Sequence, residues 1–140
     1  MKNKFLKIFL TFFLVQTNLS ANTKYFQDGI NLFTSKKFEE AKFKFEQDIV
    51  FNPKNEMSYL YLSKIFKNLD KKDLEEENLK TVILLNPQNE EAIYYLAKLK
   101  LDSSDYKKST ELNNRLSNLC KNLCNESKKL KLEIENLLKK

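Results

Sequence analysis

The residues of this chain whose type and spacing could do chemistry are its two cysteines, Cys120 and Cys124. Their spacing is not Cys-x-x-Cys, which argues against a thiol redox site. Two cysteines also cannot complete a tetrahedral zinc site, because the chain has no histidine to supply further ligands. The absence of histidine removes the commonest general base as well, and no serine or threonine has a base beside it. We therefore expect no catalytic residue, no metal site and no cofactor.

The cysteine pair has two structural interpretations. A turn among the asparagines around it (Asn118, Asn122 and Asn125) would bring the two sulfurs into bonding range and give a structural disulfide. In a continuous helix the same i, i+4 pair would form only a strained bond, and the cysteines would then be two buried free thiols. A disulfide also requires an oxidising compartment.

A run of acidic residues, Glu75 to Glu77, is the other candidate for chemistry. Neighbouring carboxylates can act as an acid/base pair or bind calcium. Calcium loops, however, alternate aspartate and asparagine around a glycine, and no such pattern occurs in this sequence. Because Lys71, Lys72 and Asp73 lie beside the run, we expect a solvated helix face.

The composition predicts an all-α protein. Hydrophobic residues make up 41% of the chain and charged residues 31%, which is typical of a folded domain. One glycine and two prolines are too few for the turns of a β-sandwich or barrel, and they exclude a glycine-rich nucleotide loop. A length of 140 residues allows one domain.

Residues 1–21 have the pattern of a secretory signal peptide. Three lysines precede an apolar run from Ile8 to Val15, and Ala21 offers a small-residue cleavage site. The run is too short for a conventional spanning helix; an uncleaved anchor or an amphipathic first helix is the alternative. Cleavage near Ala21 would make the mature protein periplasmic or secreted in a bacterium. It would remove three of 25 basic residues and none of 19 acidic ones, so the net charge would fall from +6 to +3, which argues against nucleic-acid binding.

An internal repeat sets the expected architecture. The hexapeptide Phe51–Glu56 recurs as Leu85–Glu90, with Asn-Pro inside each copy. Apolar residues at helical spacing form two segments before each hexapeptide. Each Asn-Pro ends a helix, and Asn55 and Asn89 stand where the next helix needs an N-cap. The expected helix pairs are 22–35 with 38–51, 56–69 with 72–85, and 90–102 with 105–119.

The residues within each unit resemble the tetratricopeptide repeat (TPR), a helix-turn-helix unit of about 34 residues, which is also the offset between the two hexapeptides. The first unit has the family's small residue as Gly29, followed by Ala41 and Phe45. The second unit keeps a small residue, Ser63, but has Glu75 in place of the alanine. The third unit is degenerate and has no proline at its end.

This resemblance implies a right-handed superhelix of three helix pairs followed by a capping helix. The units would be residues 22–55, 56–89 and 90–121, and residues 122–140 would cover the exposed apolar surface of the last unit. A generic antiparallel helical bundle is the alternative for the fold. A basic amphipathic membrane helix is the alternative for the last segment.

In the TPR family the first helices of successive units line a concave groove that binds an extended peptide or a helix. The resemblance places the following residues in this groove: Phe26, Ile30, Phe33, Met57, Leu60, Lys64, Asn68, Tyr94, Lys98 and Leu101. The two lysines would suit an acidic group on an apolar peptide. TPR domains that clamp a terminal carboxylate use lysine and asparagine in the first unit, where this chain has Phe26 and Ile30, so that activity is not implied. Each groove residue could instead serve packing between units.

The expected function is a non-enzymatic protein–protein interaction module in the cell envelope, with another protein or peptide as its partner. The alternative is a structural envelope protein that associates with its own copies. Its contact surface would be the groove or the end cap, with Phe26, Ile30 and Phe33 exposed in the first unit unless the amino terminus is covered.

Overall fold

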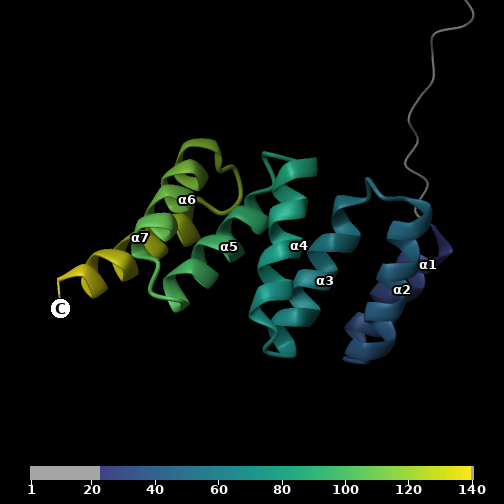
Figure 1. The fold of residues 1–140 in the computed structure, drawn as a ribbon. Helices are drawn as coiled ribbons and strands as arrows, with labels where there is room; N and C mark the ends of the chain where they lie inside the picture. Colours follow the sequence, from purple (N-terminus) through teal and green to yellow (C-terminus); the bar gives the residue numbers. More distant parts are fainter. Residues whose placement is uncertain (1–22, 140) are drawn as a thin grey trace, which may run out of the picture.

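The computed structural model describes residues 23–139, which form seven α-helices and no strand. The predicted signal segment, residues 1–21, lies outside the described residues. The helices follow the three predicted pairs closely, with the predicted cap as the seventh (Figure 1). Their bounds are α1 (Lys24–Thr34), α2 (Phe38–Phe51), α3 (Glu56–Asn68), α4 (Lys72–Leu85), α5 (Glu90–Asp102), α6 (Tyr106–Leu119) and α7 (Cys124–Leu138).

Helices α3 and α5 begin at the side-chain caps that the repeat predicted. The Asn55 side chain accepts the backbone N–H of Met57 at 3.2 Å, and the Asn89 side chain accepts that of Ala92 at 2.9 Å. These bonds satisfy N–H groups that have no partner within the helix. The predicted N-cap roles of Asn55 and Asn89 are therefore confirmed.

The turn inside each helix pair repeats with the period of the sequence. Lys36, Asp70 and Ser104 each have a left-handed backbone, with φ of 58°, 53° and 61°. In each turn the next residue donates its N–H to a carbonyl in the last turn of the preceding helix; Lys37 bonds Leu32 at 2.9 Å. This Schellman-type closure reverses the chain. The third unit therefore keeps the turn geometry although its sequence is degenerate.

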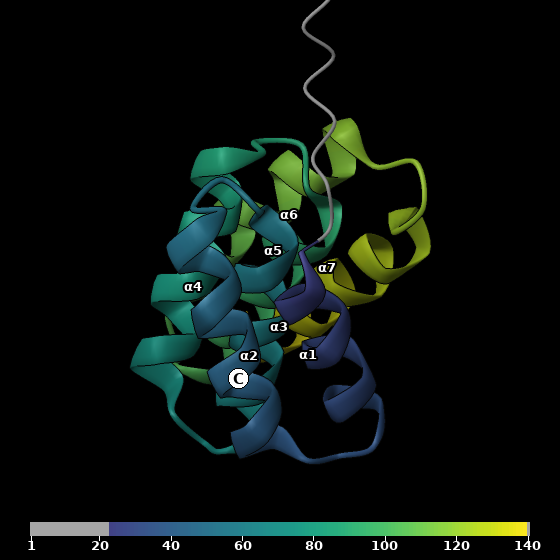
Figure 2. The same ribbon diagram turned by 90° about the vertical axis from the view of Figure 1, so that its right-hand side faces the viewer.

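The helix pairs stack in chain order. Helices α1 and α2, α3 and α4, and α5 and α6 pack as antiparallel pairs, and each pair contacts the next through α2–α3 and α4–α5. Figure 2, viewed from the α1–α2 end, shows the pairs one behind another. Helix α7 packs on α6 and also contacts α5. No helix among residues 23–139 has the length and apolarity needed to cross a membrane.

Carboxylates tie successive helices together at the edge where one pair joins the next. The buried Asp48, in the last turn of α2, accepts hydrogen bonds from Thr23, Asn55 and Ser58. Glu56, the first residue of α3, accepts the Asn86 amide at 2.7 Å. The bonds of Asp48 join the end of α2 to the starts of α1 and α3, and the bond of Glu56 joins the start of α3 to the end of α4. We call this side of the stack the junction edge, and the side with the turns inside the pairs the turn edge.

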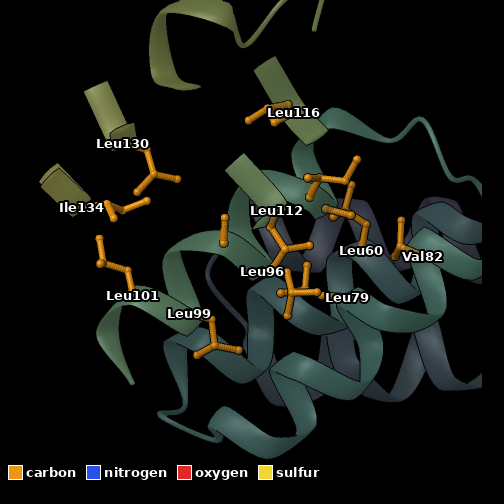
Figure 3. Close-up of a cluster of buried hydrophobic side chains, with 13 residues drawn as sticks. Leu60, Leu79, Val82, Leu96, Leu99, Leu101, Leu112, Leu116, Leu130 and Ile134 are labelled. Carbon is orange, nitrogen blue, oxygen red and sulfur yellow. The ribbon is translucent and has the colours of Figure 1, made fainter. Parts of the chain in front are cut away.

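The core has two hydrophobic clusters. The smaller one joins the first two units around Phe45, Ile65 and Phe66. The larger one runs from Leu60 to Ile134 and includes the capping helix (Figure 3). Gly29 lies against the ring of Phe45, where an added Cβ would be 2.7 Å from Cε1. The small-residue site expected from the repeat is present at this contact.

Candidate protein-binding groove

A first pocket of about 280 Å³ lies toward the turn edge of the stack, among α1, α3, α4 and α5. Three of the predicted groove residues line it, namely Phe33, Lys64 and Asn68. The structure adds four lining residues that the sequence analysis did not assign to the groove: Ser63, Lys67, Glu75 and Tyr95. The pocket therefore combines two aromatic rings with both signs of charge.

A second pocket of about 550 Å³ lies toward the junction edge. The predicted residues Met57, Leu60 and Tyr94 line it, together with residues of the loop between α6 and α7. Tyr95 lines both pockets, so they adjoin on the same face of α3 and α5. The other residues that line the second pocket are Gln88, Asn89, Glu90, Glu91, Asn122, Leu123 and Glu126. Together the two pockets form what we call the groove.

Four predicted groove residues lie elsewhere. Phe26 is 5% exposed, because its ring packs edge-on against Phe45 and Tyr61, so the expected exposure of Phe26 in the first unit is wrong. Ile30 is half-buried against the same cluster. Leu101 is 4% exposed and belongs to the larger cluster with Leu130 and Ile134 of α7 (Figure 3), and Lys98 bonds α7. The capping helix thus covers the carboxy-terminal part of the groove face expected on α5, whereas Tyr94 stays on the second pocket.

Both predicted groove lysines already have carboxylate partners. Lys64 Nζ lies 2.7 Å from Glu91 Oε1, and Lys98 Nζ lies 3.3 Å from Glu133 Oε2. Lys64 lines the first pocket, whereas Lys98 lines neither. The structure therefore does not bring the two lysines together as a site for an acidic group.

Glu75 lies in the core instead of on a solvated face. Its residue is 5% exposed, so the solvated face expected for the acidic run is wrong at this position. The reason is its place in the repeat, where Ala41 is completely buried in the first unit. Burial raises the pKa of Glu75, and the charge of Lys67 partly opposes this. The departure from alanine in the second unit was the signal in the sequence for this residue.

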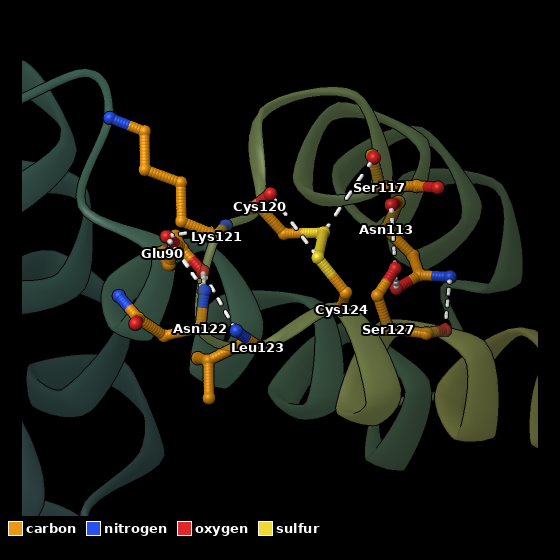
Figure 4. The surroundings of a disulfide bond; sticks show 9 residues. All are labelled: Glu90, Asn113, Ser117, Cys120, Lys121, Asn122, Leu123, Cys124 and Ser127. Carbon is orange, nitrogen blue, oxygen red and sulfur yellow. Dashed lines mark hydrogen bonds between the residues drawn. A yellow bond between two sulfur atoms is a disulfide. The ribbon is translucent and has the colours of Figure 1, made fainter.

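The cysteines and Glu90 fix the loop at the rim of the second pocket (Figure 4). Cys120 follows the last residue of α6 and Cys124 begins α7, with their sulfurs 2.12 Å apart in a disulfide, as the predicted turn allows. Glu90 accepts backbone N–H bonds from the three residues between them, at 2.9 Å for Lys121, 3.0 Å for Asn122 and 2.8 Å for Leu123. These bonds hold the pKa of Glu90 below its usual range.

The lining of the groove combines several kinds of contact group. Among the described residues, no three cysteine, aspartate or glutamate side chains come together as a metal site. The groove offers aromatic rings, an apolar floor of Met57 and Leu60, and charged groups along its length. Such surfaces bind peptides through side-chain anchors and polar contacts.

No protein-family model and no curated protein sequence matches this chain. Solved structures do match it. The first TPR of Spaghetti (RPAP3), bound to the HSP90 peptide SRMEEVD, has a TM-score of 0.73 and 16% identity over 81% of this chain and 92% of that one. The Yersinia enterocolitica type III secretion chaperone SycD, in complex with a peptide of the translocator YopD, also has a TM-score of 0.73 and 16% identity, over 83% and 92%.

A third match, the Sgt2 TPR domain from Aspergillus fumigatus, has a TM-score of 0.70 and 16% identity over 84% of this chain and 81% of that one. These identities are low, so the matches speak for the fold. They agree with the regular spacing of the left-handed turns and with the predicted architecture. This chain has the superhelical TPR fold, with three helix pairs and a carboxy-terminal capping helix.

Proposed function

We propose that this protein is a non-enzymatic protein–protein interaction module that binds a peptide or a helix in the groove. The observation that carries the proposal is the pair of adjoining pockets on one face of α3 and α5, joined at Tyr95. Two of the structural neighbours, RPAP3 and SycD, are in complex with peptides, which supports a peptide ligand for this fold.

The groove residues divide by exposure into contacts and supports. Five of the predicted residues remain partly open and would touch a ligand: Phe33, Met57, Lys64, Asn68 and Tyr94. The buried Leu60 would support the groove from beneath. Tyr95 adds a contact because it faces both pockets.

Peptide selection with matched variants tests this proposal. Peptides would be selected from a random-peptide display library on the wild-type protein and then measured on Tyr94→Ala and Tyr95→Ala. We expect these variants to bind at least about tenfold more weakly, which corresponds to about 1.4 kcal/mol. Phe43→Ala is the control, because Phe43 is 56% exposed on α2 and lines neither pocket. Equal binding by all four proteins would refute the groove.

We further propose export, with residues 1–21 as a cleaved signal and the mature protein in the periplasm or secreted. The support is the sequence pattern of basic start, apolar run and small residues. Amino-terminal sequencing of the protein from its host tests it, and an intact Met1 would contradict cleavage.

The alternative of self-association has less support at the first unit, because Phe26 is buried there. Light scattering after size exclusion decides between a monomer and a dimer.

A further inference from the structure

Glu75 is a largely buried residue whose carboxylate opens onto the first pocket and, among the described residues, has no bonded partner. It is 5% exposed and lines the pocket with Phe33 and Tyr95. Within residues 23–139 its carboxylate makes no hydrogen bond and no salt bridge. The charged groups that influence it are Lys67 on α3, Lys72 on its own helix and Asp102 on α5, and none is bonded to it.

This placement raises the free energy of the ionised carboxylate, and only the unbonded charges of Lys67 and Lys72 oppose the effect. The equivalent position in the first unit is Ala41, which is fully buried and adds no charge to the core. An ionised carboxylate that loses water without gaining a partner raises the free energy of the folded state. Groups that break a local rule in this way are found at functional sites, where a ligand supplies the missing partner.

The wall beside Glu75 attracts cations. The Lys67 ammonium lies 5.1 Å from the centre of the Tyr95 ring, and the Lys64 ammonium lies 5.9 Å from it. Lys64 is held by Glu91 and by the ring of Tyr61. Lys67 is exposed and, among the described residues, has no salt bridge, so it is free to leave the ring.

From these contacts we infer that the first pocket binds a basic side chain of the partner, an ammonium or guanidinium group that pairs with Glu75 and packs against Tyr95. Lys67 occupies the ring face in the free protein and competes with the incoming group. The inference rests on the proposed function, because it assigns the chemistry of one residue of the bound peptide. The sequence had led us to expect an acidic ligand group, because Lys64 and Lys98 would attract one if they were unpaired. Both lysines are paired with carboxylates, so a basic ligand group takes its place in the proposal.

The direct test is a titration with n-butylammonium chloride, followed by the carboxyl-carbon NMR signal of Glu75 and the ring signals of Tyr95. We expect saturable shifts of both signals. Sodium n-butyrate and n-butanol, at matched ionic strength, should leave them unchanged. Saturable shifts with butyrate and none with butylammonium would show an anion site and overturn the inference. The absence of shifts with every probe would also overturn it.

Two variants give opposite expectations for butylammonium binding. Glu75→Gln keeps the shape but removes the charge, and should weaken binding by about tenfold or more. Lys67→Met removes the internal competitor and should strengthen it severalfold. Glu77→Gln is the matched control, since it makes the same change at an exposed position of α4 and should have no effect. Weaker binding by Lys67→Met would contradict the inference.

The selected peptides separate this inference from the proposed function. If the peptides depend on Tyr94 but carry no lysine or arginine and bind Glu75→Gln as well as wild type, the groove stands and the basic-residue site is wrong. If neither Tyr94→Ala nor Tyr95→Ala weakens peptide binding, the groove proposal fails, and the NMR titration still decides the chemistry of the first pocket. Glu75→Gln should also melt at a higher temperature than wild type, so a loss of binding cannot be assigned to unfolding.

Discussion

The carboxylate of Glu90 accepts the backbone N–H of Leu123 at 2.8 Å, across 33 residues of sequence. The bond joins the first turn of α5 to the loop that leads into the capping helix. In the second unit, Glu56 makes the corresponding contact with the side-chain amide of Asn89 at 3.4 Å. The third unit has lost its Asn-Pro sequence, and its loop offers backbone N–H groups in place of the asparagine amide.

Replacing Glu90 should loosen the capping helix. Glu90→Ala leaves the N–H groups of residues 121–123 without their acceptor, so we expect a lower melting temperature and faster amide hydrogen exchange in α7. Because the pKa of Glu90 is lowered, its stabilising contribution is present above its ordinary pKa of 4.5 and is lost as the pH falls through the lower, folded-state value. Glu91→Ala, which removes a partly exposed ion pair, is the control and should change melting less.

Reducing the disulfide should act on the same region. The Cys120–Cys124 bond closes a short loop, and the loop-entropy relation gives about 2 kcal/mol for its loss. We expect dithiothreitol to lower the melting temperature and to increase exchange in α7 and the end of α6. The double variant Cys120→Ser, Cys124→Ser should already show both effects and should not respond to dithiothreitol. A wild-type protein that is equally stable in the reduced form would contradict this prediction.

Gly29→Ala should destabilise the first unit. The added methyl would lie 2.7 Å from the ring of Phe45, which is fully buried and cannot move away. We expect a loss of about 1–2 kcal/mol in the free energy of unfolding, because overpacking exceeds the gain in helix propensity. Ser63→Ala changes the corresponding position of the second unit without adding volume, and urea denaturation should find it close to wild type.

Lys36→Gly should stabilise the protein. Lys36 has a φ of 58°, a left-handed conformation that costs a residue with a side chain about 1 kcal/mol and costs glycine little. We expect a gain of about 0.5–1 kcal/mol in the free energy of unfolding, measured by urea denaturation. Lys37→Gly provides the contrast, since Lys37 has a φ of −86° and glycine there should only add freedom to the unfolded chain. A stabilising Lys37→Gly would remove the basis of this explanation.

Glu75→Gln should stabilise the protein most at neutral pH. Burial raises the pKa of Glu75 in the folded state, so the ionised form is a liability above that value, and the liability disappears as the pH falls toward the ordinary value of 4.5. We expect the variant to gain about 1 kcal/mol at pH 7 and less near pH 4. Melting curves across this pH range measure the difference. A constant difference would mean that the charge of Glu75 is not the cause.

The repeat predicted the helices well because the signals that end and start them are local. Asn-Pro and the N-cap asparagines act on their own neighbours, so the spacing of the two hexapeptides was enough to place the three helix pairs. The exposure of groove residues was harder to predict. Phe26 is buried by Tyr61 of the next unit, and Leu101 is buried by a capping helix whose path lies outside the repeat. Such contacts depend on how units stack, which a single unit does not encode.

Glu75 shows the same difficulty for charge. In the sequence it is one of three consecutive glutamates among lysines, a pattern typical of a solvated helix. Successive residues of a helix point in different directions, so the three glutamates face different sides of α4. Only Glu75 is directed toward the core and the first pocket. Only the alignment with Ala41 indicated which of the three faces inward.

The polar contacts that join successive helices are concentrated at the junction edge of the stack. The hydrogen bonds of Asp48, Glu56 and Glu90 join successive helices at the junction edge, whereas a salt bridge between Lys100 and Glu76, at 2.7 Å, joins α5 to α4 toward the turn edge. The second pocket lies toward the junction edge and the first toward the turn edge. We therefore expect thermal bending to change the width of the first pocket more than that of the second. A bound partner would then contact a more rigid pocket at one end of the groove and a more adaptable pocket at the other.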